Sequence, residues 1–258
     1  METTKTKPTI KNALLFAAAM LPVGIASGIL FIIDYHNRPA YMQEAVLAQA
    51  GSYGMYVFIS FFQSIVPACI LGFFGYILSE KVGLMRRFTF AKKATLISIV
   101  AGIVLAVAML STDAIFVSMG MPTVDTGSEG FSFTLFVHAL LFGGIIEEVA
   151  SRLFLMSLVA LIIWKLFFKK IAAENIPTVV FVIANLLVAI PFAVIHLVGG
   201  LELFPDVNTP LFITRVILVN SGMSIGFGWI YQKYGIHYAM VCHAMAHVTL
   251  NVVTYAIL

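Results

Sequence analysis

The sequence predicts an all-α fold, a polytopic bundle of about seven transmembrane helices. Of its 258 residues, 61% are hydrophobic and 10% are charged, and the mean hydropathy is +1.02. Soluble domains contain about 45–50% apolar and about 25% charged residues. The composition therefore excludes a water-soluble enzyme, a disordered chain, a secreted disulfide scaffold and a nucleic-acid-binding protein. It predicts the lipid bilayer as the surroundings of the chain.

Charged residues, Pro and Gly clusters divide the apolar sequence into seven segments. A helix needs about 20 apolar residues to cross about 30 Å of hydrocarbon, so each segment predicts one span. The predicted spans are Asn12–Ile33, Tyr53–Leu78, Ala94–Leu110, Phe131–Trp164, Thr178–Val198, Leu211–Tyr231 and His237–Leu258. Because no internal repeat or low-complexity linker separates them, we expect one membrane domain with an N-terminal three-helix segment, 1–130, and a helical core, 131–258.

Lys and Arg residues gather in the loops on one side of this predicted bundle. That side receives Lys5, Lys7, Lys11, Lys81, Arg86, Arg87, Lys92, Lys93, Lys165, Lys169, Lys170 and Lys233, whereas the other side receives Arg38 alone. Cytoplasmic loops carry an excess of Lys and Arg. The charges thus predict a cytoplasmic N-terminus. As the location we expect the plasma membrane of a prokaryote. The loops near 113–129 and 202–206 are then expected outside, together with the C-terminus.

The segment Phe131–Trp164 is too long for one straight span, because at about 1.5 Å per residue it would measure about 50 Å. We expect it to break at Gly143 and Gly144, with the part before them lying in the interface or entering obliquely. Glu147 and Glu148 would then lie in the first turns of the spanning helix. The helix dipole favours carboxylates there.

Ionisable side chains within the apolar segments are the candidates for function, since a charge at mid-bilayer costs roughly 2.5–3.5 kcal/mol on insertion scales. They are Glu147, Glu148, Arg152, His138, His196, Arg215, His243 and His247. We assign structural roles to two of them. His138 falls in the oblique part, and Arg215 lies near a segment end, where its side chain can snorkel.

Glu148 and Arg152 are four residues apart, so they share one helical face and the guanidinium can neutralise the carboxylate. Glu147 lies about 100° further round the helix, where it is less compensated and better suited to act as a base. The alternative is a structural ion pair that locks two helices together.

Three histidines follow on later segments. His196 lies one turn after Phe192, and His243, His247 and Asn251 form one polar stripe on the last segment. An imidazole can transfer a proton, bind a metal or donate a hydrogen bond to an oxyanion. Interhelical hydrogen bonding is the alternative for the stripe.

These motifs, each on its own apolar helix, resemble the CPBP family of intramembrane proteases, which includes type II CAAX prenyl endopeptidases and Abi-like bacteriocin-immunity proteins. The family pattern is EExxxR, FxxxH and HxxxN or HxxxD; the first two match Glu147 to Arg152 and Phe192 to His196. The third fits two frames. Either His243 is the motif histidine and His247 replaces the Asn or Asp, or His247 is the motif histidine and Asn251 completes HxxxN.

The resemblance implies an endopeptidase that hydrolyses a peptide bond of a membrane-associated peptide or protein. It implies water activation by Glu147 and His196, orientation of the carboxylate pair by Glu148 and Arg152, oxyanion hydrogen bonds from His243 and His247, and substrate contacts at Phe192 and Asn251. Two histidines and a carboxylate can also hold Zn²⁺, but the His-Glu-x-x-His spacing is missing, so no cofactor is firmly expected.

Two other classes stay open. In a proton- or ion-coupled transporter, Glu148, Arg152 and the histidine stripe would line a relay. The sequence has no paired half-helices in corresponding halves, which are the usual sign of a transport site. In a non-catalytic membrane immunity or scaffold protein, only the surfaces would matter.

Overall fold

The computed structural model describes residues 10–121, 131–203 and 209–256, and every regular element within them is a helix. Seven stretches of these residues are long and apolar enough to cross a membrane: Ile10–Asn37, Tyr53–Lys81, Lys92–Ser118, Phe133–Phe167, Thr178–Leu201, Pro210–Tyr234 and Ile236–Tyr255. The predicted all-α, multi-pass fold is thereby confirmed. The predicted end of the last span at Leu258 lies outside the described residues.

Most spans are single helices, but two of them contain π-helical turns. The elements are α1 (Ile10–Asn37), α2 (Ala40–Ala50), α3 (Tyr53–Ile65), π-helix η1 (Val66–Leu71), α4 (Gly72–Lys81), α5 (Lys92–Ser118), α6 (Phe133–Leu141), π-helices η2 (Phe142–Glu147) and η3 (Val149–Met156), α7 (Ser157–Phe167), 3₁₀ turn η4 (Ala173–Asn175), α8 (Thr178–Leu203), α9 (Pro210–Tyr234) and α10 (Ile236–Ala256). The short helix α2 was not predicted.

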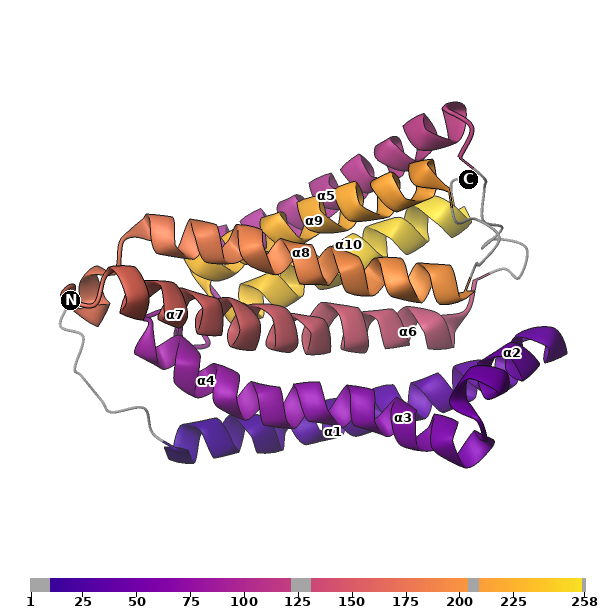
Figure 1. Cartoon of the computed structure of the whole chain (residues 1–258), viewed down its shortest axis with the longest axis horizontal. Coiled ribbons are helices and arrows are strands. Elements are labelled where there is room, and N and C mark those ends of the chain that lie inside the picture. The colour runs from indigo at the N-terminus through magenta and orange to yellow at the C-terminus, as the bar shows by residue number, and fades with distance from the viewer. Residues whose placement is uncertain (1–9, 122–130, 204–208, 257–258) are drawn as a thin grey trace.

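The long helices run along the long axis of the molecule (Figure 1). Helices α1, α3 and α4 form one side, α5, α9 and α10 form the other, and α6 to α8 lie between them in this view. Helix α10 packs against α5, α8 against α9, α1 against α3, and η3 against α4. The third span thus packs with the last four, and the first two spans attach through η3, α6 and α7.

Small residues let these helices approach closely, as is typical of packing in membranes. A Cβ atom at Gly102 of α5 would overlap the carbonyl oxygen of Cys242 on α10. A Cβ atom at Gly75 of α4 would lie 2.9 Å from the backbone of Leu153 in η3. At these two points the helices therefore contact each other backbone to backbone.

The predicted break at Gly143 and Gly144 is wrong. The helical run Phe133–Phe167 continues through them as the π-helical turns η2 and η3. The glycines have a packing role instead, because they allow η2 to lie against α10. Glu147 and Glu148 consequently lie inside a continuous helical run and not in its first turns. Wide turns of this kind are frequent at functional sites.

The third span also ends later than predicted. Helix α5 continues to Ser118, so Asp113 is helical and not part of an outside loop. Its carboxylate accepts two hydrogen bonds of 2.5 Å from the guanidinium of Arg215 on α9. Arg215 thus has a partner on a neighbouring helix. Helix α8 continues to Leu203, and the remaining parts of the two predicted outside loops, 122–129 and 204–206, lie outside the described residues.

Candidate active site

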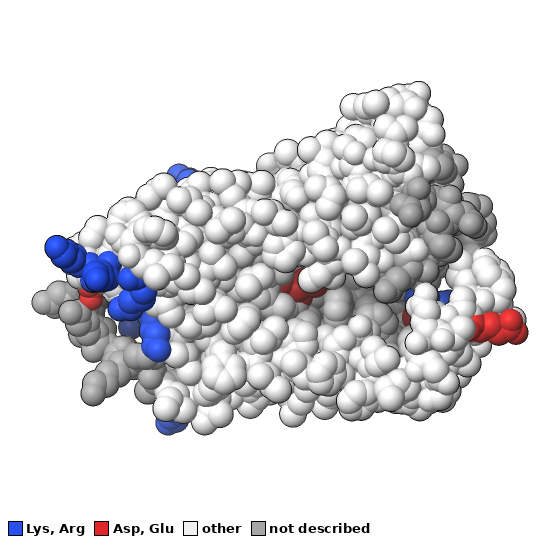
Figure 2. Space-filling model, viewed as in Figure 1, with Lys and Arg blue, Asp and Glu red and all other residues white. Residues whose placement is uncertain are grey.

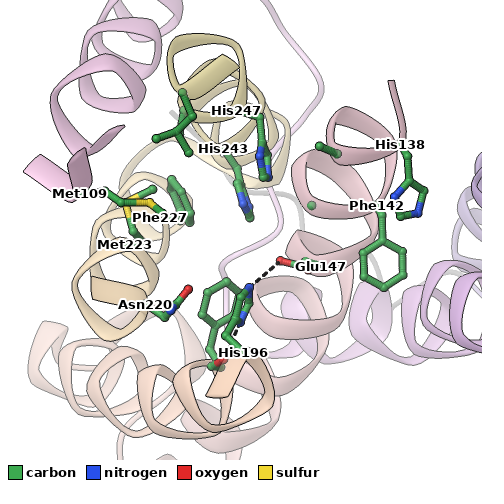
Figure 3. Close-up of a pocket in the computed structure, with 15 residues that line it drawn as sticks. Met109, His138, Phe142, Glu147, His196, Asn220, Met223, Phe227, His243 and His247 are labelled. Carbon is green, nitrogen blue, oxygen red and sulfur yellow. Dashed lines mark hydrogen bonds and ion pairs between the residues drawn. The ribbon is translucent and has the colours of Figure 1, made fainter. Parts of the chain in front are cut away.

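A cavity of about 210 Å³ lies between η2, α8, α9 and α10, within the membrane-spanning part of the bundle. Figure 3 shows the side chains that line it. Five of the sequence-predicted site residues are among them: Glu147, Phe192, His196, His243 and His247. Other lining residues are Met109, His138, Phe142, Gly143, Asn220, Met223, Phe227 and Leu250. Five ionisable groups from three membrane spans, counting His138, therefore share one cavity.

Glu147 and His196 face each other across the cavity. His196 Nε2 lies 3.9 Å from Glu147 Oε2, too far for a direct hydrogen bond. His196 Nδ1 lies 2.7 Å from the carbonyl oxygen of Phe192. Because a carbonyl only accepts, Nδ1 donates, and Nε2 of the neutral ring is left as the acceptor that faces Glu147.

This pair is the part of the site that reaches the surface. The side chain of Glu147 is 21% exposed and that of His196 is 35% exposed. Figure 2 shows acidic atoms within a hollow on a face that is otherwise uncharged around it. Part of the Glu147 side chain is therefore accessible at the surface of the helix bundle, whereas its Oε2 atom is buried.

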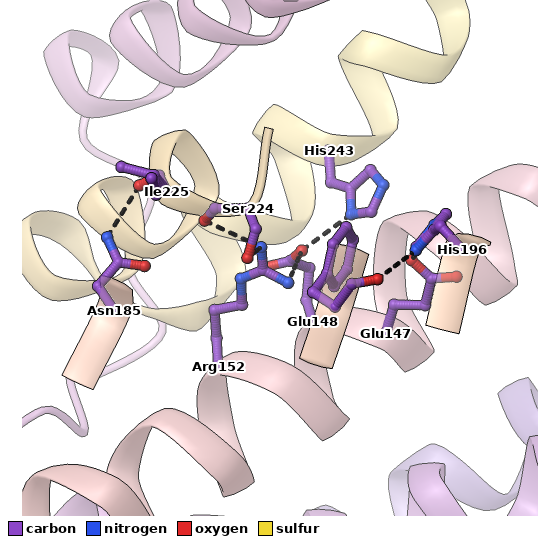
Figure 4. Close-up of polar contacts among 9 residues, drawn as sticks. Glu147, Glu148, Arg152, Asn185, His196, Ser224, Ile225 and His243 are labelled. Atoms are coloured by element: carbon purple, nitrogen blue, oxygen red, sulfur yellow. Dashed lines mark hydrogen bonds and ion pairs between the residues drawn. The ribbon is translucent and has the colours of Figure 1, made fainter. Parts of the chain in front are cut away.

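Glu148 and Arg152 form a buried ion pair behind the cavity (Figure 4). Glu148 Oε1 lies 3.3 Å from Arg152 Nη1 and accepts a 2.8 Å hydrogen bond from His243 Nδ1. Arg152 Nη2 donates to the carbonyl and to the hydroxyl oxygen of Ser224 on α9, both at 3.0 Å. The two side chains are at most 1% exposed, so their charges depend on these partners.

Aromatic rings complete the environment of the guanidinium. Arg152 Cζ lies 4.6 Å from the ring centroid of Phe192 and 5.4 Å from that of Phe227, within cation–π range. The same two rings line the cavity. Phe192, which we predicted as a substrate contact, therefore separates the buried ion pair from the cavity.

The last helix contributes two stacked imidazoles. The rings of His243 and His247 are 4.9 Å apart and inclined by 14°, and His243 stacks at 4.2 Å on Phe227. Asn251 does not line the cavity; its amide donates to the carbonyl of His247 on its own helix at 2.9 Å. Of the two frames for the third motif, the cavity thus brings together the residues of the His243 and His247 frame.

Two lining residues were not expected at the site. His138 contacts the rings of Phe31 and Phe142 at 4.0 and 5.5 Å. Asn220 on α9 donates its amide to the carbonyl of Val216 at 2.8 Å, so its Oδ1 is turned toward the cavity (Figure 3). The position of a polar amide within an apolar segment could have indicated Asn220. It was missed because only ionisable residues were taken as candidates.

The residues do not fit a zinc site made of two histidines and a carboxylate. Within the described ranges, no three His, Cys, Asp or Glu side chains are arranged to hold a metal ion. Glu148, the buried carboxylate, is already engaged by Arg152 and His243. We therefore derive no catalytic step through a metal.

Comparison with protein families gives a match over residues 129–249 to the model described as type II CAAX prenyl endopeptidase Rce1-like. The matched range contains Glu147, Arg152, His196, His243 and His247, and it ends before Asn251. A search of curated proteins finds no match, and a search of solved structures finds none either. Residues 129–249, a little under half of the chain, are thus similar to the type II CAAX prenyl endopeptidase family.

Proposed function

We propose that the protein is an intramembrane endopeptidase that hydrolyses a peptide bond of a membrane-associated substrate. The observation that carries this proposal is the convergence of Glu147, His196, His243 and His247 on one cavity within the spans. The family match supports the same reaction class. Such a cavity supplies the base, the proton carriers and the hydrogen-bond donors that amide hydrolysis needs.

In the proposed reaction, Glu147 acts as the general base on a water molecule. Its carboxylate and the acceptor Nε2 of His196 are 3.9 Å apart, a separation that one water can bridge. The hydroxide attacks the carbonyl carbon while Glu147 takes the proton. Glu147 then gives the proton to the leaving nitrogen as the C–N bond breaks, so protons and charge balance.

The remaining residues bind and position. The ion pair of Glu148 with Arg152 fixes the ring of His243 through its Nδ1, which leaves Nε2 for the substrate. His247 Nε2 has no hydrogen-bond partner among the described residues and is assigned to the oxyanion as a donor. The Oδ1 of Asn220 is assigned to accept a backbone N–H of the substrate.

We also propose that the N-terminus is cytoplasmic in a plasma membrane. Figure 2 shows Lys and Arg side chains gathered at one end of the molecule. The loops at that end join α4 to α5, α7 to α8 and α9 to α10. An excess of positive charge in these loops favours their cytoplasmic placement.

The test is Glu147→Gln, which keeps the shape of the side chain and removes the base. The substrate is a quenched fluorescent peptide that ends in a prenylated CAAX sequence, offered to the purified protein in lipid vesicles. We expect cleavage to fall by about 10²-fold or more, the range of a lost general base. Glu44→Gln, an exposed carboxylate on α2, is the control and should cleave normally. Undiminished cleavage by Glu147→Gln would exclude Glu147 as the base.

A further inference from the structure

Gly143 of η2 lies directly against the imidazole of His247 on α10. A Cβ atom at position 143 would overlap Nε2 of that ring and would lie 3.1 Å from Cδ2 and 3.3 Å from Cε1. All three atoms belong to the edge of the ring that lacks a protein partner. The space that a side chain at Gly143 would fill is therefore the place of this imidazole.

The ring of His247 has little room to retreat within its own helix. It stacks on His243, and His243 is itself held by Phe227 on one side and by the hydrogen bond to Glu148. A methyl group at Gly143 would have to turn the ring of His247 away from its present position. The nitrogen that would move first is Nε2, the one nearest the added carbon.

The neighbouring glycine does not share this contact. A Cβ atom at Gly144 would lie 3.2 Å from the Cβ of Ala244 and 3.3 Å from its Cα, without a histidine among the nearest atoms. Both glycines belong to the same π-helix and both face α10. Gly144 thus provides a matched comparison in which helix packing changes and the imidazole is not touched.

We propose that Gly143 is a positioning residue, whose missing side chain places Nε2 of His247 in the cavity. The assignment rests on the proposed function, in which that nitrogen contacts the oxyanion. If the proposal holds, the effect of a side chain at position 143 depends on the size of the side chain at position 247. An Asn at position 247 is shorter than His and still donates an N–H, so it should leave room for a Cβ at position 143.

The test is a double-mutant cycle with Gly143→Ala and His247→Asn, measured on the prenylated peptide in vesicles. In the wild-type background we expect Gly143→Ala to lower kcat by at least about tenfold with little change in KM, since displacements near 1 Å have such effects. In the His247→Asn background the same change should lower kcat less than about twofold. Gly144→Ala should have one and the same effect in both backgrounds. Equal losses from Gly143→Ala in both backgrounds would overturn the proposal.

A second cycle needs no activity and so separates this proposal from the proposed function. Thermal unfolding in detergent is compared for Gly143→Ala in the wild type and in His247→Ala, which removes the ring. We expect a lower Tm only where the ring is present. The same drop in both backgrounds would show that position 143 senses helix packing and not His247, whatever the Glu147→Gln experiment gives.

Discussion

The first three spans and the last four spans satisfy their buried polar groups in different ways. Ser60 and Ser64 on α3 donate to carbonyls four residues earlier on their own helix, at 2.9 Å each. Glu148 and Arg152 instead depend on His243 and Ser224, which come from α10 and α9. Each of the two serines thus has a hydrogen bond within its own helix, whereas the buried ion pair depends on neighbouring helices.

Burial follows the same division. The most apolar stretches of the first three spans are each 22% buried within the protein, against 39–44% for the last four. The first spans therefore expose most of their surface to lipid, which suits side chains that need no distant partner. In the last four spans, the buried ion pair that depends on neighbouring helices lies next to the cavity.

The largest effect is expected when one partner of the buried ion pair is removed. Arg152→Met leaves Glu148 as a buried carboxylate with only His243 beside it, a change that typically costs about 3–5 kcal/mol. We expect a large fall of Tm in detergent and loss of peptide cleavage. Arg87→Met, at an exposed position in the loop before α5, should leave both unchanged.

The double variant Glu148→Gln with Arg152→Met separates charge from packing. With both charges removed, Tm should recover most of the loss, since a neutral pair carries no unpaired charge. Cleavage should stay low because His243 is no longer held by a carboxylate. A wild-type Tm for Arg152→Met alone would mean that the pair is not the structural centre of the last four spans.

The sequence predicted the parts of this fold that depend on hydropathy alone. Seven apolar runs predict seven spans, and these are confirmed. The i to i+4 spacing of Glu148 and Arg152 predicts their pairing on one helix, which the structure contains at 3.3 Å. Both inferences need only the periodicity of one helix and the thickness of a bilayer.

The parts that depend on a neighbouring helix could not be predicted this way. Gly143 and Gly144 have the composition of a helix break, but α10 lies against them and makes them contact residues. His138 and Asn220 line the cavity only because α6 and α9 turn these side chains toward it. That Asn251 does not line the cavity likewise depends on how α10 is rotated.

Asn220 and Asn251 lie in two of the last four spans and differ in whether they face the cavity. Both amides donate to a carbonyl four residues earlier, at 2.8 and 2.9 Å, but only Asn220 lines the cavity. We expect Asn220→Leu to raise KM for the prenylated peptide several-fold, up to about tenfold, since a lost neutral hydrogen bond is worth about 0.5–1.5 kcal/mol. Asn251→Leu should leave KM unchanged. A larger effect at Asn251 would favour the frame in which it completes the third motif.

The smallest expected effect compares two buried serines, one from each group of spans. Ser64 on α3 contacts the hydroxyl of Ser27 on α1 at 3.3 Å, whereas the hydroxyl of Ser224 accepts from the guanidinium of Arg152. Ser64→Ala loses a neutral contact between helices, which averages about 0.6 kcal/mol in membranes, and Ser224→Ala loses a bond to a charged group, worth about 1.5–3 kcal/mol. In detergent, Tm should therefore fall little for Ser64→Ala and clearly more for Ser224→Ala, and only the latter should slow cleavage. Equal shifts in Tm would mean that the charge of the partner does not decide how much a buried hydroxyl contributes to stability in this bundle.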